Sequence, residues 1–317
     1  MAPLVRGNER TLQRLTSGTD CTSLQSRILV GLLRLFRVKK RMASAGAVQH
    51  RVRRLALRPV LFGPTGLGRG VEVTRKDVAG WPIYHTAPAA HCEGCNIVVF
   101  LHGGGYINEI VRAHWRIVGY FTRTAEVRCI VPIYPLAPHN TAEEVVPAMG
   151  ELLRKILQDA GAVKVTVVGN SAGAALGLAA AQWLRDRGHT QPSRLVLISP
   201  GGDFSVSRPE QVPIAARDPV NDIPGVREVG RLFAGDLDIA HPYVSPLNGD
   251  FRGLAPIIIF SGTLDLFYLD CVDMAAKASA AGVAVELHLK QGQPHNYAGM
   301  PTPEGREART TILRSVA

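Results

Sequence analysis

The sequence predicts a single α/β domain built on a mostly parallel sheet with helices on both faces. Short, nearly all-apolar segments alternate with helical segments from residue 97 to residue 315. Strands that are apolar along their whole length are typical of parallel sheets, because both faces of such a sheet are covered. The length of 317 residues suits one large domain, and the absence of a run of 18 apolar residues argues against a transmembrane helix.

The elements are expected in a regular order. A hairpin is predicted at Val71–Val78 and Trp81–His85, with Ala79-Gly80 as its turn. The expected later strands are Ile97–Leu101, Arg128–Pro132, Val163–Val168, Arg194–Ser199, Pro256–Phe260 and Val283–Leu289. The expected helices are Ala113–Ala125, Glu143–Ala160, Ala172–Arg187, Asp270–Ala281 and Pro303–Ser315. Residues 200–255 interrupt this order, and their length indicates a functional insertion.

The charge is unevenly distributed along the chain. The net charge is +10, yet residues 1–58 hold 13 Lys and Arg against Glu9 and Asp20, which gives +11. The remaining residues hold 36 − 13 = 23 basic and 26 − 2 = 24 acidic side chains, which gives −1. This distribution indicates a basic arm or cap on a neutral body and argues against a nucleic-acid-binding core.

The basic segment 1–58 is expected to be helical. Leu24, Ile28, Leu32 and Leu35 recur at helical spacing between basic residues. We favour packing of this apolar stripe against the neighbouring domain; the alternative is a helix that lies on a membrane surface. The layout of a signal peptide is missing, because the apolar stretch begins late and contains Arg34, so the expected location is the cytoplasm, with membrane association as the alternative.

Five cysteines are too few and too scattered for a disulfide framework: Cys21, Cys92, Cys95, Cys129 and Cys271. The Cys92-Glu93-Gly94-Cys95 motif has the spacing of redox and zinc sites. No second pair of cysteines completes four zinc ligands, so we expect incidental loop cysteines and no metal site.

The strongest functional signal is Gly169-Asn170-Ser171-Ala172-Gly173, between an apolar strand and a helix of small residues. This G-x-S-x-G pattern is typical of a nucleophile at a sharp strand-to-helix turn, where the flanking positions must be small. The amino end of the following helix offers N–H groups to a developing oxyanion.

A second signal is His102-Gly103-Gly104-Gly105-Tyr106, directly after the strand Ile97–Leu101. Consecutive glycines leave backbone N–H groups free of side chains, so that they can approach an oxygen. The sequence therefore predicts an oxyanion-binding loop at Gly103–Gly105.

A catalytic serine needs a base and a residue that orients the base. His295 lies in a loop after the last predicted strand, and Asp265 lies in the equivalent loop after Pro256–Phe260. Active-site groups gather at the carboxyl edge of a parallel sheet, and the order Ser…Asp…His is the one that α/β-hydrolases use. Asp270 and Asp273 are weaker candidates, since they are expected on the following helix and pointing away, and His288 lies within a strand.

Over residues 70–315 the chain resembles the hormone-sensitive-lipase-like bacterial esterases of the α/β-hydrolase superfamily, which include acetyl hydrolases. The resemblance depends on the two motifs above, on Tyr243-Val244-Ser245-Pro246-Leu247 with Gly253-Leu254-Ala255-Pro256, and on Tyr134-Pro135-Leu136-Ala137-Pro138, which has Pro135 where Arg is usual. It implies an eight-stranded sheet, no cofactor and hydrolysis of small-molecule acyl esters, with short acyl chains preferred. It also implies a helical cap formed by segment 1–58 and an insertion at about 200–240, on a catalytic domain that spans 59–317.

Carried over residue by residue, the resemblance makes Ser171, Asp265 and His295 a triad. Gly104, Gly105 and Ala172 then form the oxyanion hole, with Gly103 as the alternative. Three departures affect rate and substrate preference: Asn170 replaces an Asp, Asn296 replaces a Gly, and no Pro follows Asp265. An amidase or arylformamidase on the same fold is the alternative activity, and a non-enzymatic small-molecule receptor is a weaker one. The physiological substrate and the oligomeric state are not specified by the sequence.

Overall fold

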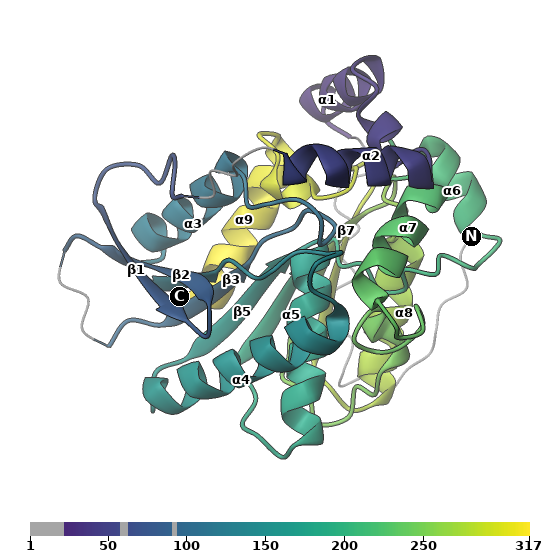
Figure 1. Cartoon of the computed structure of the whole chain (residues 1–317). Coiled ribbons are helices and arrows are strands. Elements are labelled where there is room, and N and C mark those ends of the chain that lie inside the picture. The colour runs from purple at the N-terminus through teal and green to yellow at the C-terminus, as the bar shows by residue number, and fades with distance from the viewer. Residues whose placement is uncertain (1–21, 58–62, 91–93) are drawn as a thin grey trace.

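A twisted sheet runs through the centre of the computed structural model, which describes residues 22–57, 63–90 and 94–317 (Figure 1). Within these residues the sheet has eight strands in the order β1-β2-β4-β3-β5-β6-β7-β8. The β1–β2 and β2–β4 pairs are antiparallel and the other five pairs are parallel. The strands are β1 (Val71–Val78), β2 (Trp81–Pro88), β3 (Ile97–Leu101), β4 (Arg128–Pro132), β5 (Val165–Asn170), β6 (Arg194–Ile198), β7 (Ile257–Gly262) and β8 (Val285–Lys290).

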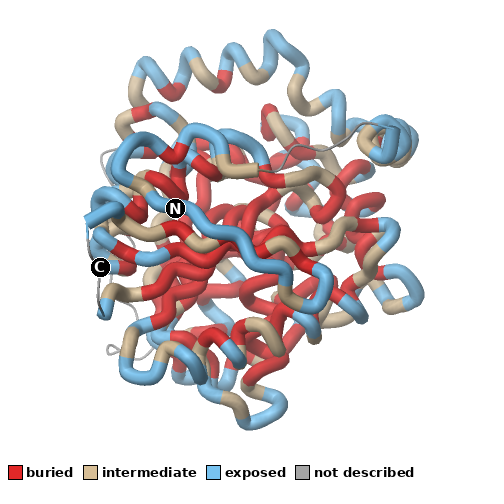
Figure 2. The backbone as a smooth tube through the Cα atoms, turned by 60° about the vertical axis from the view of Figure 1, so that its left-hand side comes forward, coloured by how far each residue is buried: buried red, intermediate tan, exposed pale blue. Residues whose placement is uncertain are grey.

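Helices cover both faces of the sheet. The helices of the described residues, which include those of the N-terminal segment and the insertion, are α1 (Leu24–Leu35), α2 (Ala45–Ala56), α3 (Arg112–Thr124), α4 (Ala142–Ala160), α5 (Ala172–Asp186), α6 (Gln211–Arg217), α7 (Ile223–Ala234), α8 (Tyr268–Ala280) and α9 (Pro303–Val316), with short 3₁₀ turns η1 (Val38–Met42), η2 (Pro246–Asn248) and η3 (Tyr297–Gly299). Figure 2 shows that the buried residues concentrate in the sheet and on the inner sides of the helices.

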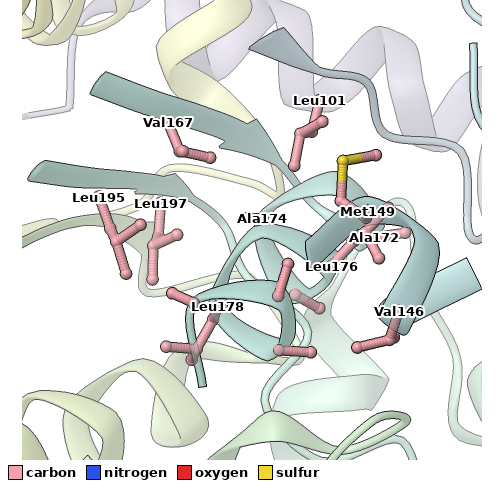
Figure 3. Close-up of a cluster of buried hydrophobic side chains, with 14 of the residues drawn as sticks. Leu101, Val146, Met149, Val167, Ala172, Ala174, Leu176, Leu178, Leu195 and Leu197 are labelled. Carbon is pink, nitrogen blue, oxygen red and sulfur yellow. The ribbon is translucent and has the colours of Figure 1, made fainter. Parts of the chain in front are cut away.

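Alternate side chains of the central strands enter two different cores, because successive residues of a strand point to opposite faces. On one face, Val167 of β5 and Leu197 of β6 pack with Leu176 of α5 and Met149 of α4 (Figure 3). On the other face, Val168 and Val196 pack with residues of α3 and α9, among them Trp115. The expected α/β-hydrolase fold with an eight-stranded, mostly parallel sheet is confirmed.

The predicted hairpin, strands and helices of the catalytic body are present, with ends that differ by three residues or fewer. The insertion holds two helices, α6 and α7, that the sequence did not single out. In α7, Gly225 and Gly230 weaken the helical signal, since glycine is unfavourable inside a helix. Tertiary packing requires these glycines: a Cβ at Gly225 would lie 2.2 Å from the backbone oxygen of Met42, and one at Gly230 would lie 2.6 Å from Phe204.

The described part of the basic segment forms α1, η1 and α2, so it is largely helical as expected, but the predicted packing of its apolar stripe is wrong. Leu24, Ile28, Leu32 and Leu35 are exposed, with 41–72% of their surfaces open to solvent. The stripe faces outward because α1 is held by its opposite side. Residues 1–21 of the segment lie outside the described residues.

Two serines at the start of α1 hold this orientation. Ser23 and Ser26 each donate a hydroxyl hydrogen bond to Glu304 of α9, at 2.8 and 2.7 Å, and the backbone N–H of Ser23 donates to the same carboxylate. Closer to the body, α2 buries Val48 completely. No helix in the described part of the chain is long and apolar enough to cross a membrane.

Candidate active site

Ser171 lies at the sharp turn between β5 and α5. Its backbone has φ 54° and ψ −120°, a strained conformation for a residue with a side chain. The glycines on either side relieve crowding: a Cβ at Gly169 would lie 2.4 Å from Ala174 Cα, and one at Gly173 would lie 2.2 Å from the backbone oxygen of Leu101. The G-x-S-x-G spacing therefore follows from the close contact of helix α5 with β3 and β5.

The glycine loop follows β3, which lies next to β5 in the sheet. Gly104 and Gly105 have positive φ angles of 131° and 60°, and a Cβ at Gly103 would lie 3.2 Å from Ser171 Cβ. The backbone N–H groups of Gly104, Gly105 and Ala172 donate to no acceptor within the described ranges. Ala172 is the first residue of α5, so its N–H lies at the positive end of the helix dipole. Backbone N–H groups without an acceptor in the protein are the type of donor that binds an oxyanion.

His295 connects the serine to a carboxylate. Its Nε2 lies 2.8 Å from Ser171 Oγ, and its Nδ1 lies 2.9 Å from Asp265 Oδ2. Asp265 is completely buried after β7, and its Oδ1 accepts a hydrogen bond from the backbone N–H of Phe267. Burial alone would lower the pKa of His295, but the charge and hydrogen bond of Asp265 outweigh burial and raise it.

The other histidines and aspartates near these elements take part in other contacts. His102 stacks on Tyr134, and burial lowers its pKa to about 3, so its ring stays neutral. His288 stacks on Phe260 within the sheet. Asp270, on α8, is buried and accepts hydrogen bonds from Arg208 and Gln211 of the insertion. The fold therefore brings together Ser171, His295 and Asp265 and leaves the alternatives outside this chain of contacts.

Asp218 is a buried carboxylate near the site that sequence reasoning missed. It lies between α6 and α7, and its Oδ2 accepts a hydrogen bond of 2.8 Å from the backbone N–H of Leu266, next to Asp265. Burial and the charge of Asp265 raise the pKa of Asp218 to about 6. The local sequence carries no signal for this role, because a lone Asp before a Pro is ordinary in a loop.

A cavity of about 330 Å³ opens onto Ser171 and His295. The glycine loop and the residues that follow it line one part of the cavity, and two segments that are distant in sequence line another part. The lining residues from the insertion are Phe204, Val220, Asn221, Val226 and Val229, and those from the N-terminal segment are Val38, Arg41, Met42 and Arg51. Both segments that the sequence assigned to a cap therefore contribute to the lining of the cavity.

The expected absence of a metal site concerns the Cys92–Cys95 motif, of which Cys92 lies outside the described residues. Cys95 is disulfide-bonded, whereas Cys129 and Cys271 are buried free thiols. Within the described ranges, no three His, Cys, Asp or Glu side chains are arranged to hold a metal ion.

Comparison with known proteins identifies relatives of the chain. Residues 98–299 match a family described as an alpha/beta hydrolase fold. A triacylglycerol lipase of Mycobacterium tuberculosis is 33% identical over 232 residues, which cover 73% of this chain and 48% of the lipase. The putative acetyl-hydrolase LipR of the same organism is 30% identical over 243 residues, 76% of this chain and 78% of that protein. The chain thus spans about half the length of the lipase but most of the acetyl-hydrolase.

Solved structures of a lipase and a putative esterase have a similar fold. A hormone-sensitive lipase from a metagenome library superposes with a TM-score of 0.78 at 26% identity, covering 93% of this chain and 98% of that one. A putative esterase from Staphylococcus aureus superposes with a TM-score of 0.81, covering 91% and 98% of the two chains; at 21% identity this likeness concerns the fold alone.

Proposed function

Since this chain belongs to the α/β-hydrolase family, we propose that it is a carboxylesterase that uses Ser171, His295 and Asp265 as a catalytic triad. The observation that carries the proposal is the position of His295, in hydrogen-bond contact with Ser171 on one side and with buried Asp265 on the other. Relatives named as acetyl-hydrolases, esterases and a lipase support ester bonds as the target.

The reaction begins with the Ser171 hydroxyl. As its Oγ forms a bond to the ester carbonyl carbon, the hydroxyl proton passes to His295 Nε2. Asp265 holds the ring in the tautomer with a proton on Nδ1 and stabilises the imidazolium. The ester C–O bond then breaks, and His295 returns the proton to the leaving alcohol. In the second half of the reaction, water attacks the acyl-serine while His295 takes its proton. The bond to Ser171 Oγ then breaks, His295 returns the proton to Oγ, and the carboxylic acid is released.

The tetrahedral oxyanion would be stabilised by the N–H groups of Gly104, Gly105 and Ala172, with Gly103 as the alternative donor in the loop. Donors fixed by the backbone need no reorganisation during the reaction, and each oxyanion-hole donor contributes about 3–4 kcal/mol to the lowering of the barrier. The amino end of α5 adds a favourable dipole at the same place.

The size of the cavity favours a small substrate. At about 330 Å³, it lies at the lower end of the volume range of small-molecule sites. We infer that short acyl esters are preferred, and that a cap made of η1, α2 and the insertion at about 200–240 sets this limit. The division into a cap segment at 1–58 and a catalytic domain at 59–317 belongs to the same proposal.

The test is a panel of p-nitrophenyl esters from acetyl to palmitoyl, with the p-nitroanilides of the same acyl groups. The expected result is turnover that falls as the acyl chain lengthens, and anilide turnover that is far below ester turnover. Faster cleavage of the anilides would instead indicate an amidase. If Ser171→Ala kept both ester and anilide hydrolysis, the proposed triad would be contradicted.

A further inference from the structure

The outer side of α1 is an apolar surface in contact with solvent. It consists of Leu24, Ile28, Leu32, Leu35 and Phe36, whose exposed fractions range from 41% to 73%. In the described part of the chain, these five make up most of the exposed large hydrophobic side chains. These five residues form the α1 outer face.

The charged side chains in the same segment as the α1 outer face are all basic. Residues 22–57 contain nine Lys and Arg and no Asp or Glu. Arg27, Arg34, Arg37 and Lys40 of this segment are exposed. A helix with an apolar face beside basic side chains is typical of segments that lie in the interface of an anionic membrane. This charge pattern does not favour a second copy of the chain, because two such segments would repel each other.

The position of α1 connects this surface with the active site. The 3₁₀ turn η1 follows α1 after two residues and contributes Val38 and Arg41 to the cavity wall. In Figure 1, α1 lies at the outer edge of the molecule, beyond α2. A lipid surface against α1 would thus lie near the cavity in which the ester is cleaved.

We propose that the α1 outer face docks on an anionic lipid surface, with the helix lying in the interface. Apolar side chains enter the boundary between headgroups and acyl chains, and the neighbouring cations contact lipid phosphates. The polar side of α1 stays on the protein, through the hydrogen bonds of Ser23 and Ser26 to Glu304.

The experiment is co-sedimentation of the full-length protein with vesicles of phosphatidylcholine, with and without phosphatidylglycerol. We expect at least about tenfold stronger binding to the anionic vesicles, weakened by salt. The double variant Ile28→Gln/Leu35→Gln should lose most of this binding, whereas Val212→Gln, at an exposed apolar position on α6, should keep it. Hydrolysis of a soluble short ester should be unchanged in both variants.

Two outcomes would overturn the proposal. One is equal binding of the intact protein to neutral and anionic vesicles. The other is a dimer in solution that Ile28→Gln/Leu35→Gln converts to a monomer without any change in vesicle binding, which would identify the occupant of the face as a second copy.

Asp218 supports a second, independent inference, which rests on the proposed triad. Its Oδ1 accepts the N–H groups of Val220 and Asn221, at 2.7 and 3.0 Å, so the carboxylate is held firmly within the insertion. Its Oδ2 accepts the N–H of Leu266, the residue after Asp265. A proline at position 266 could not donate this bond.

The charged groups around Asp218 are two residues of the proposed triad and an ion pair on the adjoining elements. Asp265 and His295 interact with it electrostatically, and a negative Asp218 raises the pKa of His295. On the adjoining elements, Lys39 of η1 pairs with Asp222 at the start of α7, 3.4 Å away. Asp218 therefore joins the insertion to the loop of the orienting carboxylate, Asp265, and adds negative charge near His295.

The geometry points to Asp218 as a positioning residue that holds the Asp265 loop and stabilises the protonated form of His295. The test is the pH dependence of kcat/KM for Asp218→Asn, with Asp222→Asn as the control. Loss of the negative charge should move the acidic limb to lower pH by roughly half a unit or more and reduce kcat several-fold. The Asp222→Asn control should leave the acidic limb of the kcat/KM profile in place, because Asp222 pairs with Lys39 and not with the triad. It should also keep α7 capped, because Asn is as good an N-cap residue as Asp.

An Asp218→Asn profile with an unshifted acidic limb and unchanged kcat would overturn this role. That result differs from a failure of the proposed triad, which is read from Ser171→Ala. If Ser171→Ala is inactive while the profile of Asp218→Asn is unchanged, only the positioning role is wrong.

Discussion

Asn170 donates a hydrogen bond from its Nδ2 to Oδ1 of Asn296, over 2.9 Å. The first residue precedes Ser171 and the second follows His295, so this bond joins the nucleophile turn to the histidine loop. Asn296 has a φ of 62°, a left-handed conformation that Asn tolerates better than most residues other than Gly. The two positions at which the chain departs from the esterase pattern around its serine and histidine therefore form one matched contact.

An Asp at position 170 should disturb this contact. The carboxylate of Asn170→Asp would face the amide oxygen of Asn296, and two acceptors cannot share a hydrogen bond unless one side chain turns. We expect kcat/KM to fall, and Asn170→Asp/Asn296→Gly to recover part of the loss. A double-mutant cycle should give a coupling free energy of about 0.5–3 kcal/mol. Additive effects of the two substitutions would show that the contact is without consequence.

Ser171→Ala should abolish ester hydrolysis, with a loss of about a thousandfold or more in kcat. Its fold should be intact, since alanine adds no atoms at the turn, and the thermal unfolding midpoint should stay close to that of the parent protein. Ser207→Ala, at an exposed position of the insertion, is the matched control and should keep full activity. More than a tenth of the parental rate in Ser171→Ala would rule out this nucleophile.

The pH profile should follow the protonation of His295. The charge of Asp265 raises the pKa of His295 from its ordinary value of about 6.5, and the base must be neutral to accept a proton. We therefore expect kcat/KM to rise with pH through a single midpoint above 6.5, measured with a soluble ester at constant ionic strength.

Asp265→Asn tests the interaction between His295 and Asp265 by changing the carboxylate. It should reduce kcat by up to about ten-thousandfold, because an amide favours the wrong histidine tautomer. Asp273→Asn, on the exposed side of α8, should have little effect on the rate. Equal losses in both variants would mean that the orienting carboxylate has been assigned incorrectly.

Gly173→Ala should destabilise the protein by more than about 2 kcal/mol, since the new methyl group would lie 2.2 Å from the backbone oxygen of Leu101. Gly31→Ala is the control, because its added carbon would meet nothing within 4 Å on α1. That substitution should stabilise the helix slightly, by about 0.5–1 kcal/mol. Urea unfolding of the two variants gives both free energies, and similar values would contradict the packing explanation of the motif.

Local patterns in the sequence predicted the elements of the body and the residues of the candidate site. Apolar strands, helical spacing and the glycines beside Ser171 are short-range signals, since each reflects what its own segment must bury or avoid. The positions of Asp265 and His295 also followed from local order, because loops after parallel strands meet at one edge of the sheet.

Only the tertiary structure decided which distant groups meet. Asp218 reaches the N–H of Leu266 across 48 positions, and Asn170 reaches Asn296 across 126. The direction of the α1 stripe depends on a carboxylate near the other end of the chain, Glu304, which holds the serine side of the helix against the body. An amphipathic pattern specifies that a helix has two faces, but the contacts of its polar face determine which of them turns toward solvent.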